Sequence, residues 1–462
     1  MSKLKSKFEK HESRLSTTDE HGNRVYVYPE NVKGKWRNRR HIFYWSLILI
    51  YLILPWIYYQ NQQLVLLDIA NREFHFFGQV FYAHNTPLIV LVFIGFAMLI
   101  AFLTSLYGRV WCGYACPQTV FIDAIYLRIE RLIEGNSLQR EKLDQTPWNF
   151  KKIQLKTLKW FCFTLVSLHI AHSFIGYFVG TRELFWITLS PPWENWTLFL
   201  MTMGITALCL FDFGWFREQF CTIACPYGRF QSVLMDENTL TVSYDFQRGE
   251  PRRGLTTQDN EGDCVNCYQC VRVCPTGIDI RNGTQLECIG CTQCIDACDE
   301  IMSKLNRPSG LIRYASENQL KKIPQKKIQP RTIIYLFLLS LILATFIYLL
   351  KGQPKLDLVI LNQGKSPYTE LQGSAIRNQK LIKLTLNQKD PMAIKLRSHN
   401  PEIKITTPLS PWPLRQGINK APLFLTFQKE QLSHQSVSID LINNENQEVI
   451  QTIEVQLVGP RH

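Results

Sequence analysis

The chain has 462 residues and a mass of 53.9 kDa, which excludes a mini-protein and leaves room for several domains of about 100 to 200 residues each. Hydrophobic residues make up 46% of the chain and its mean hydropathy is -0.08, so disorder along the whole length is excluded and strongly apolar segments must be local. A net charge of +13 is typical of proteins that bind nucleic acid or anionic membranes, and of membrane proteins with basic cytoplasmic loops.

Five apolar stretches are long enough to cross a membrane. They cover residues 42–60, 87–107, 158–180, 196–216 and 332–350, and each has about the 20 residues that a helix needs to cross the hydrocarbon layer. A single stretch of this kind also fits a buried core helix, but five in one chain, with Trp and Tyr near their ends, indicate transmembrane helices. The sequence predicts a four-helix membrane domain over residues 42–230 and a fifth transmembrane helix at 332–350.

The distribution of Lys and Arg predicts the orientation of these helices. Residues 1–41 form a basic tail with eleven Lys or Arg, and the loops at 108–157 and 217–331 carry eight and fifteen, whereas the loops at 61–86 and 181–195 carry one each. Because positively charged loops stay in the cytoplasm, we expect the N-terminus and both basic loops inside and the C-terminal segment outside. The net positive charge of the chain then reflects its orientation in the membrane. No basic stripe with interleaved aromatic residues supports nucleic-acid binding, so none is expected.

Residues 351–462 contain no cysteine and read as short strands. Apolar and polar residues alternate at 380–386, 402–406, 423–427, 436–441 and 448–457, and a period of two gives each strand one buried face. Turn-forming residues separate the strands at intervals of roughly ten residues, which is typical of a β-sandwich. We therefore predict an all-β sandwich of immunoglobulin-like size after the fifth helix.

Eight cysteines between residues 264 and 298 carry the strongest motif. Two C-x2-C-x2-C-x3-C runs follow each other, the spacing with which bacterial ferredoxins bind two [4Fe-4S] clusters, each run lending its fourth cysteine to the other cluster. The predicted ligands of cluster one are Cys264, Cys267, Cys270 and Cys298. Those of cluster two are Cys288, Cys291, Cys294 and Cys274. Residues 231–331 are therefore predicted to form a ferredoxin domain of α+β type.

A pair of zinc ribbons is the alternative to the two clusters, because C-x2-C pairs also hold zinc. Zinc takes four thiolates, and the pattern of three plus one, repeated twice, favours the clusters. Pro275 follows the first run as in ferredoxins, whereas Asp299 stands after Cys298, which departs from the usual proline. The position between the fourth and fifth helices places the domain in the cytoplasm, where thiols stay reduced.

Two further cysteine pairs follow the second and fourth predicted helices, in the sequences Trp-Cys112-Gly-Tyr-Ala-Cys116-Pro and Phe-Cys221-Thr-Ile-Ala-Cys225-Pro. They make the two halves of the membrane domain look like copies of one unit. Thiolates are soft ligands that suit Cu(I), and all four could hold a third iron–sulfur cluster if they converge on one site. The alternative is that these cysteines only pack in the core as apolar side chains. We predict a catalytic and metal-binding role for these four cysteines and call them the membrane-edge quartet.

Other polar residues within the predicted helices give weaker signals. His169 and His172 lie three residues apart in the third helix, and ionisable residues at membrane depth are candidates for function. Contact with haem or quinone and a polar pair satisfied by a neighbouring helix remain equally open. Cys162 and Cys209 have no partner at ligand spacing, and we expect both to pack as apolar side chains.

The five spans, the two aromatic-Cys-x3-Cys-Pro repeats, the double cluster run and the β-domain together resemble the CcoG family, also called FixG or RdxA, the cytochrome c oxidase accessory proteins of bacteria. The resemblance covers nearly the whole chain. It implies a place in the bacterial cytoplasmic membrane with the C-terminal domain in the periplasm. It also implies assembly of cbb-type oxidase through reduction of Cu(II) to Cu(I), with a copper chaperone or exporter and oxidase subunits as partners.

The sequence thus predicts a membrane-bound iron–sulfur protein with two [4Fe-4S] clusters and possible copper, acting as a cupric reductase. The sequence does not identify the electron donor, and it contains no G-x-G-x-x-G motif that would indicate a nucleotide cofactor. Two other functions stay open. One is a quinol-linked electron relay to a partner redox enzyme, in which His169 and His172 would matter most; the other is a non-redox scaffold for oxidase assembly.

Overall fold

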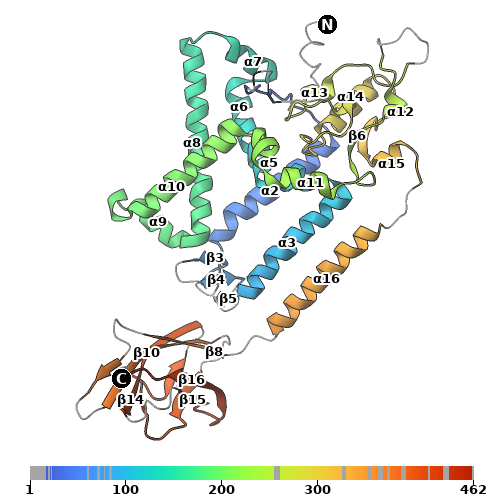
Figure 1. The fold of residues 1–462 in the computed structure, drawn as a ribbon. Coiled ribbons are helices and arrows are strands. Elements are labelled where there is room, and N and C mark those ends of the chain that lie inside the picture. The colour runs from blue at the N-terminus through green and yellow to red at the C-terminus, as the bar shows by residue number, and fades with distance from the viewer. Residues whose placement is uncertain are drawn as a thin grey trace. The chain divides into compact units, whose positions relative to one another are not determined.

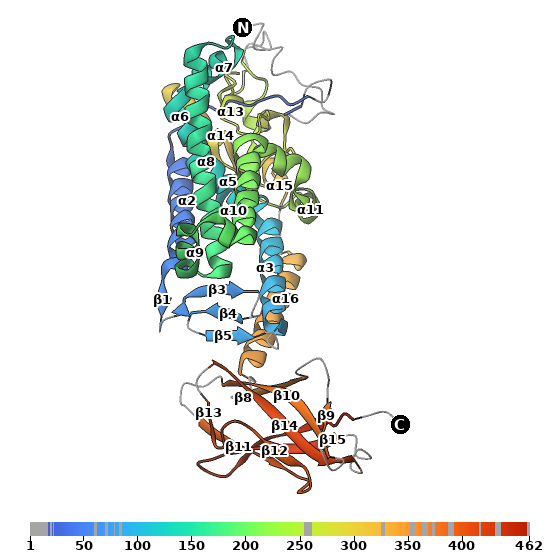
Figure 2. The same cartoon turned by 90° about the vertical axis from the view of Figure 1, so that its left-hand side faces the viewer.

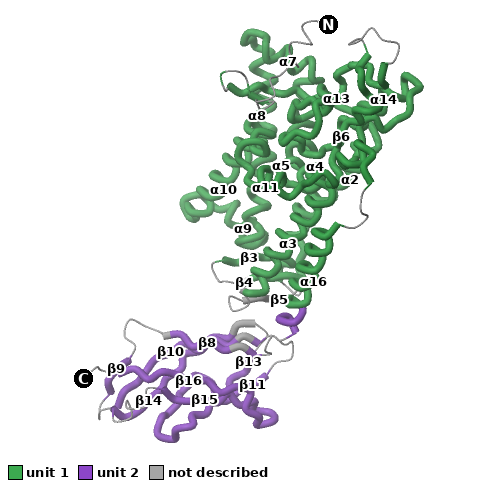
Figure 3. The backbone as a smooth tube through the Cα atoms, turned by 45° about the vertical axis from the view of Figure 1, so that its right-hand side comes forward, with its two compact units in different colours: residues 1–346 green, residues 347–462 purple. Residues whose placement is uncertain are grey.

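The computed structural model describes residues 17–18, 21, 23–59, 62–69, 73–77, 79–82, 86–253, 261–324, 329–351, 356–362, 368–371, 375–386, 392–414, 417–429 and 436–459. Contacts divide the chain into two compact units, Met1–Phe346 and Ile347–His462 (Figure 3). The first unit contains the predicted membrane and ferredoxin regions, and the second contains the predicted β-domain.

Long helices dominate the first unit (Figure 1). They are α2 (Lys35–Ile53), α3 (Thr86–Tyr107), α8 (Phe150–Val179), α10 (Trp196–Cys209) and α16 (Pro330–Lys351), the last of which crosses the boundary between the units. Within the described part of the chain, four helical segments are long and apolar enough to cross a membrane: Pro87–Tyr107, Phe150–Val179, Trp196–Phe216 and Pro330–Lys351. None of the residues of α16 is buried, and an apolar helix with no covered face is typical of one surrounded by lipid.

The first predicted span differs from the helix that forms. Helix α2 begins at Lys35, well before residue 42, and ends at Ile53. A 3-10 turn η1 (Leu54–Trp56) and a short strand β1 (Tyr58–Tyr59) follow. Pro55 explains the early end, because proline lacks the amide hydrogen that a continuing helix needs. The predicted end near residue 60 was therefore wrong, and the apolar part of α2 is shorter than the about 20 residues of a full span.

Between α2 and α3 the chain forms small antiparallel sheets. Strand β2 (Gln62–Gln63) pairs with β1, and β3 (Val65–Asp68), β4 (Glu73–Phe76) and β5 (Gln79–Tyr82) form a three-stranded sheet in that order (Figure 2). Helix α9 (Thr181–Leu189) and the turn η4 (Pro192–Glu194) connect α8 to α10. The side chain of Gln63 joins these two loops, since its Oε1 accepts a hydrogen bond from the Thr181 amide at 2.9 Å.

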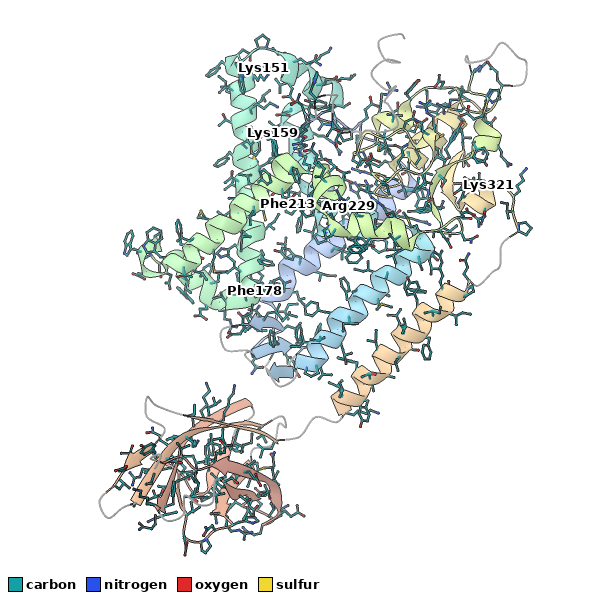
Figure 4. All side chains as sticks on the ribbon, viewed as in Figure 1. Lys151, Lys159, Phe178, Phe213, Arg229 and Lys321 are labelled. Carbon is teal, nitrogen blue, oxygen red and sulfur yellow. The ribbon has the colours of Figure 1, made fainter. Side chains whose placement is uncertain are left out.

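Short helices follow the C-terminal ends of α3 and α10, where the two Cys-x3-Cys pairs lie. After α3 these are α4 (Val110–Tyr114), α5 (Pro117–Phe121), the π-helical turn η3 (Ile122–Tyr126), α6 (Leu127–Glu134) and α7 (Ser137–Gln145). After α10 they are the π-helical turns η5 (Leu210–Phe216) and η6 (Phe220–Ala224), then α11 (Pro226–Leu234). An apolar core joins both sets to α2 and α8. Phe213 of η5 (Figure 4) lies in this core. Its ring centroid is 5.5 Å from that of Tyr126.

A buried ion network joins the same elements. The Glu130 carboxylate on α6 lies 2.8 Å from Arg140 of α7, 3.1 Å from Arg217 and 3.3 Å from Lys159 of α8. Burial opposes ionisation of Glu130, but the nearby cations, Arg217 first, outweigh it and hold the pKa of Glu130 well below its usual range. These contacts fix the position of Arg217, four residues before Cys221.

The ferredoxin region is built of short elements around the cysteines. Strand β6 (Thr241–Tyr244) pairs antiparallel with β7 (Ile312–Ala315), and the helices are α12 (Phe246–Gly249), α13 (Gln269–Arg272), η7 (Ile280–Asn282), α14 (Gln293–Lys304) and α15 (Glu317–Leu320). Apolar side chains of both strands and of α14 form one core together with most of the cysteines. This mixture of helices and strands agrees with the predicted α+β type.

The second unit contains two antiparallel sheets. One has the order β12-β14-β10-β8 with β9 also on β10, and the other has the order β13-β11-β15-β16. The strands are β8 (Leu356–Asn362), β9 (Tyr368–Glu370), β10 (Ala375–Leu386), β11 (Met392–Ser398), β12 (Lys404–Thr406), β13 (Trp412–Leu414), β14 (Gly417–Gln428), β15 (Ser436–Asn443) and β16 (Val449–Gln456). Alternating residues of both sheets fill a common apolar core. The five predicted strands all form, whereas β8, β9, β11 and β13 were not predicted; the immunoglobulin-like topology stays a prediction.

Candidate redox site

The cysteine runs of the ferredoxin region share one backbone device. In each run the residues on both sides of the second cysteine have left-handed backbone angles, with φ of 54° and 58° at Asn266 and Tyr268 and of 67° and 62° at Gly290 and Thr292. Non-glycine residues adopt this conformation at a cost of roughly 1–2 kcal/mol. Both turns thus curl tightly around their cysteines and then enter a helix, α13 or α14.

Two cavities collect the eight cysteines. One, of about 360 Å³, is lined by Cys264, Cys267, Cys270 and Cys298 among others. The other, of about 340 Å³, is lined by Cys274, Cys288, Cys291 and Cys294, with Cys270 at its edge. Each fourth cysteine therefore lies with the other run's first three, which is the grouping that the spacing predicts. Cys270 borders both cavities, so the two are neighbours.

The chemistry of these thiols fits iron–sulfur ligation. Burial raises the pKa of Cys288 to about 11 and that of Cys274 and Cys298 to about 12, so the free thiols are neutral at pH 7. A bound metal must displace these protons and then stabilises the thiolates. Among the described residues, no three His, Cys, Asp or Glu side chains lie close enough to hold a single metal ion. Ligands of a four-iron cluster are spaced more widely, because each binds a different iron.

The two pairs of the membrane-edge quartet have the same backbone geometry. The amide of Cys116 donates to the Trp111 carbonyl at 2.9 Å, and the amide of Cys225 donates to the Phe220 carbonyl at 2.8 Å. Each second cysteine precedes a helix that begins with proline, α5 or α11. This equivalence supports the prediction that the two halves of the membrane domain repeat one unit.

The quartet lies directly against the second cavity. Cys112 and Cys221 pack in one apolar cluster with Ile289, Cys291 and Tyr227. Burial raises the pKa of Cys112 to about 11, and the charges of its neighbours Cys116 and Cys225 contribute to the rise. The site is therefore desolvated and close to the predicted ligands of cluster two.

The backbone makes the closest approach at Gly113. A Cβ atom at this position would lie 2.5 Å from the Gly290 carbonyl oxygen and 3.0 Å from that of Ile289. From the other side, the Tyr44 hydroxyl donates to the Gly113 carbonyl at 2.7 Å. The first cysteine pair can contact the ferredoxin loop at this distance only because residue 113 has no side chain.

Charged side chains of α2 complete the junction. The Arg40 guanidinium donates to the Cys291 carbonyl at 2.5 Å and to the Asp123 carboxylate at 2.5 Å, and Arg37 donates to Asp123 at 2.7 Å. The Asp296 carboxylate accepts the Arg37 amide at 2.7 Å. Burial opposes ionisation of Asp123, but Arg40 and Arg37 outweigh it and lower the pKa of Asp123 to about 2. These contacts join α2, the segment after the first cysteine pair and α14.

Comparison with known proteins identifies the family. A model described as a 4Fe-4S dicluster domain matches residues 216–317, and a model described as a 4Fe-4S binding domain matches residues 88–134. Protein RdxA of Cereibacter sphaeroides is 36% identical over 78% of this chain and 79% of its own. The chain belongs to the RdxA/FixG family.

Two further proteins resemble parts of this chain. Nitrogen fixation protein FixG of Rhizobium meliloti is 37% identical over 63% of this chain and 57% of its own. A crystal structure of a FixG-related protein from Vibrio parahaemolyticus covers 23% of this chain and 94% of its own, with 14% identity and a TM-score of 0.18, a likeness too weak to describe the fold. Both matching models describe 4Fe-4S binding, and this RdxA/FixG chain is an iron–sulfur protein with two [4Fe-4S] clusters.

The other predicted residues of this RdxA/FixG chain lie apart from the cysteines. His169 on α8 is exposed, and His172 is half-buried with its Nε2 3.2 Å from the Thr188 hydroxyl. Cys209 packs at the edge of the helical core and Cys162 is half-buried. His172 thus has one polar contact with a neighbouring helix. Contact of the pair with haem or quinone stays an untested alternative.

Sequence reasoning missed Gly113, Arg40 and Asp123. The charge of Arg40 was attributed to membrane topology alone, and Asp123 lies in a basic loop without any motif. Gly113 stands inside the first Cys-x3-Cys pair, where the second pair has Thr222. This difference between the repeats was the one available signal that the first pair meets another backbone.

Proposed function

We propose that the chain transfers electrons from its two [4Fe-4S] clusters to the membrane-edge quartet and there reduces Cu(II) to Cu(I). The observation that supports this best is that Cys291, a predicted ligand of cluster two, shares one apolar cluster with Cys112 and Cys221. An electron on cluster two is thereby within one layer of side chains of the quartet.

The proposed ligands of cluster one are Cys264, Cys267, Cys270 and Cys298, and those of cluster two are Cys274, Cys288, Cys291 and Cys294. The two cavities lined by these sets support the assignment. When bound, each cluster supplies reversible transfer of one electron. Cys270 lines both cavities and makes the two clusters neighbours.

The proposed copper chemistry follows from the sulfur ligands. Thiolates prefer Cu(I) to Cu(II), so release of the electron at Cys112, Cys116, Cys221 and Cys225 favours the reduced ion. Each Cu(II) takes one electron, and two reduced clusters therefore supply two Cu(I) ions. A cytoplasmic reductant must return the electrons to the clusters.

The proposed setting is the bacterial cytoplasmic membrane, with the ferredoxin region inside and the C-terminal unit in the periplasm. The four apolar helices and the basic residues of the inner loops support this orientation. Cu(I) would then pass to a copper chaperone or exporter and on to cbb-type oxidase subunits, the partners that the family resemblance implies.

An anaerobic copper titration tests the proposal. The full chain is purified in detergent, its clusters are reduced with dithionite, the excess dithionite is removed, and Cu(II) is added. We expect cluster absorption to return to its oxidised form as a Cu(I)-specific chelator reports an equal number of Cu(I) ions.

The matched variants are Cys225→Ser and Cys162→Ser. The first should slow Cu(I) formation at least tenfold, and the second should leave it unchanged. Clusters that stay reduced in the presence of Cu(II) would exclude copper reduction. Reoxidation of the clusters by a quinone, with copper left untouched, would instead favour the electron relay.

A further inference from the structure

The cysteines within the two matched regions are too many for two clusters. Residues 216–317 contain ten cysteines, and two [4Fe-4S] clusters take eight thiolates. The eight cysteines around the two cavities leave Cys221 and Cys225 over. Residues 88–134, matched by a second 4Fe-4S binding model, contain only Cys112 and Cys116. A cluster in that region needs two more thiolates from elsewhere.

The fold brings these two incomplete pairs together. Cys112 and Cys221 lie in one apolar cluster, and both pairs present the same backbone geometry, with the second cysteine at the start of a proline-led helix. The contact of Cys112 and Cys221 with this cluster therefore brings one cysteine of each pair to the same place.

The quartet also lies next to the predicted site of cluster two. Cys291, which lines the cavity of cluster two, belongs to the same apolar cluster as Cys112 and Cys221. An electron carrier at the quartet would therefore be a direct neighbour of cluster two.

An additional contact fits a sulfur that carries negative charge. The Gln231 side chain is fully buried and its Nε2 donates to Cys112 Sγ at 3.3 Å. Amide donors to ligand sulfurs are among the means by which proteins tune iron–sulfur clusters. Gln231 lies on α11, after the second pair, and so one repeat supplies the donor for the other repeat's thiolate.

We propose that Cys112, Cys116, Cys221 and Cys225 hold a third [4Fe-4S] cluster. Its role as the last carrier rests on the proposed electron-transfer function, but the site itself stands on the cysteines alone. Cys270 borders both ferredoxin cavities, and Cys291 packs in one cluster with Cys112 and Cys221, so these residues would connect the three clusters. This assignment replaces the role of the four thiolates as copper ligands, because iron would occupy all four. The third cluster would then supply the electron that reduces each Cu(II).

Iron content tests the site without any activity measurement. The full chain is purified anaerobically in detergent, reconstituted with iron and sulfide, and freed of unbound iron. Three clusters predict about 12 iron and 12 sulfide per chain, whereas two predict about 8. Reductive titration should correspondingly take up three electrons per chain, 1.5 times the number for two clusters. A chain with 8 iron and two electrons overturns the proposal.

Single substitutions assign the extra iron. Cys112→Ser and Cys225→Ser should each remove one third of the iron and leave the electron paramagnetic resonance signals of the ferredoxin clusters in place. Cys162→Ser and Cys209→Ser, which change cysteines outside the quartet, should keep all of it. Retention of all the iron in the quartet variants overturns the proposal, as does binding of one copper per wild-type chain in place of the third cluster.

The two proposals fail in different ways. If a quartet variant loses all its iron through misfolding, the wild-type iron content and electron count still decide. A chain with 12 iron that does not reduce Cu(II) retains the third cluster and excludes the copper function. A chain with 8 iron that reduces Cu(II) retains the copper function and excludes the third cluster.

Discussion

Near the membrane-edge quartet the interior contains buried ion pairs among its apolar side chains, whereas apolar side chains make up the common core of the C-terminal unit. Near the quartet the buried side chains include Arg40, Asp123, Glu130 and Arg217. In the C-terminal unit the common core is made of aliphatic and aromatic residues from both sheets.

The two interiors should respond differently to substitution. An ion pair out of water is stable only while both partners are present, and it fixes the position of the groups that it joins. An apolar core loses stability in proportion to the volume removed. Ion pairs therefore suit a junction where cysteines of distant segments must meet, and an apolar core suits a unit that only has to stay folded.

The largest effect is expected at Glu130. Glu130→Ala leaves Arg140, Arg217 and Lys159 without their shared carboxylate, and loss of one partner of a buried pair costs about 3–5 kcal/mol. Thermal unfolding in detergent, followed by cluster absorption, measures the loss. Glu300→Ala is the control, because Glu300 pairs with Lys304 on the exposed face of α14 and such pairs contribute about 0–1 kcal/mol. Equal losses in both variants would refute the contrast.

A smaller effect is expected at the backbone contact of Gly113. In Gly113→Ala the new methyl group meets the backbone of Gly290, and since neither backbone can yield easily, the cost is about 1–3 kcal/mol. The loop of cluster two should also move away from the first cysteine pair, so reoxidation of the clusters by Cu(II) should slow. Stopped-flow absorption measures that rate. Gly204→Ala on α10 is the control, because its Cβ would meet nothing within 4 Å.

The apolar core of the C-terminal unit should give a graded and local response. Ile439 on β15 is fully buried, and Ile439→Val removes one methylene at a cost of about 0.5–1.5 kcal/mol. Hydrogen exchange should increase in β15 and in its partners β11 and β16. Iron content and the rate of cluster reoxidation should not change. A loss of iron in this variant would show that the two interiors are not independent.

The smallest effect is expected for the stability of the C-terminal unit at low pH. Hydrogen bonds from Thr452, at 2.7 Å, and from His399 lower the pKa of Asp440 below its ordinary value. A carboxylate with a lowered pKa stabilises the fold above the ordinary carboxyl range, near pH 4, and this contribution is lost as the pH falls below it. Calorimetry of the full chain should show less acid destabilisation of this unit in Asp440→Asn than in the wild type. An unchanged pH profile would contradict the role of Asp440.

The sequence by itself determined what depends on near neighbours along the chain. The spacing of the eight cysteines defined the cluster runs, long apolar stretches defined four helices, and the alternation of residues defined five strands. Each of these signals is complete within about 35 residues, because helices, strands and cluster loops are formed by local backbone geometry. The prediction of the C-terminal end of α2 was wrong although that end depends on local sequence, because the apolar run continues past Pro55, where the helix does not.

Only the tertiary structure decided which distant segments meet. Cys112 and Cys221 lie in different repeats, and their contact depends on how both repeats pack against the ferredoxin loop. The partners of Arg40 are likewise Asp123 and the Cys291 carbonyl, one of them 251 positions away along the chain. Such contacts leave no periodic pattern, because burial, shape and charge of the whole interior select them. The quartet is therefore two separate cysteine pairs in the sequence, and the fold brings Cys112 and Cys221, one from each pair, into one apolar cluster.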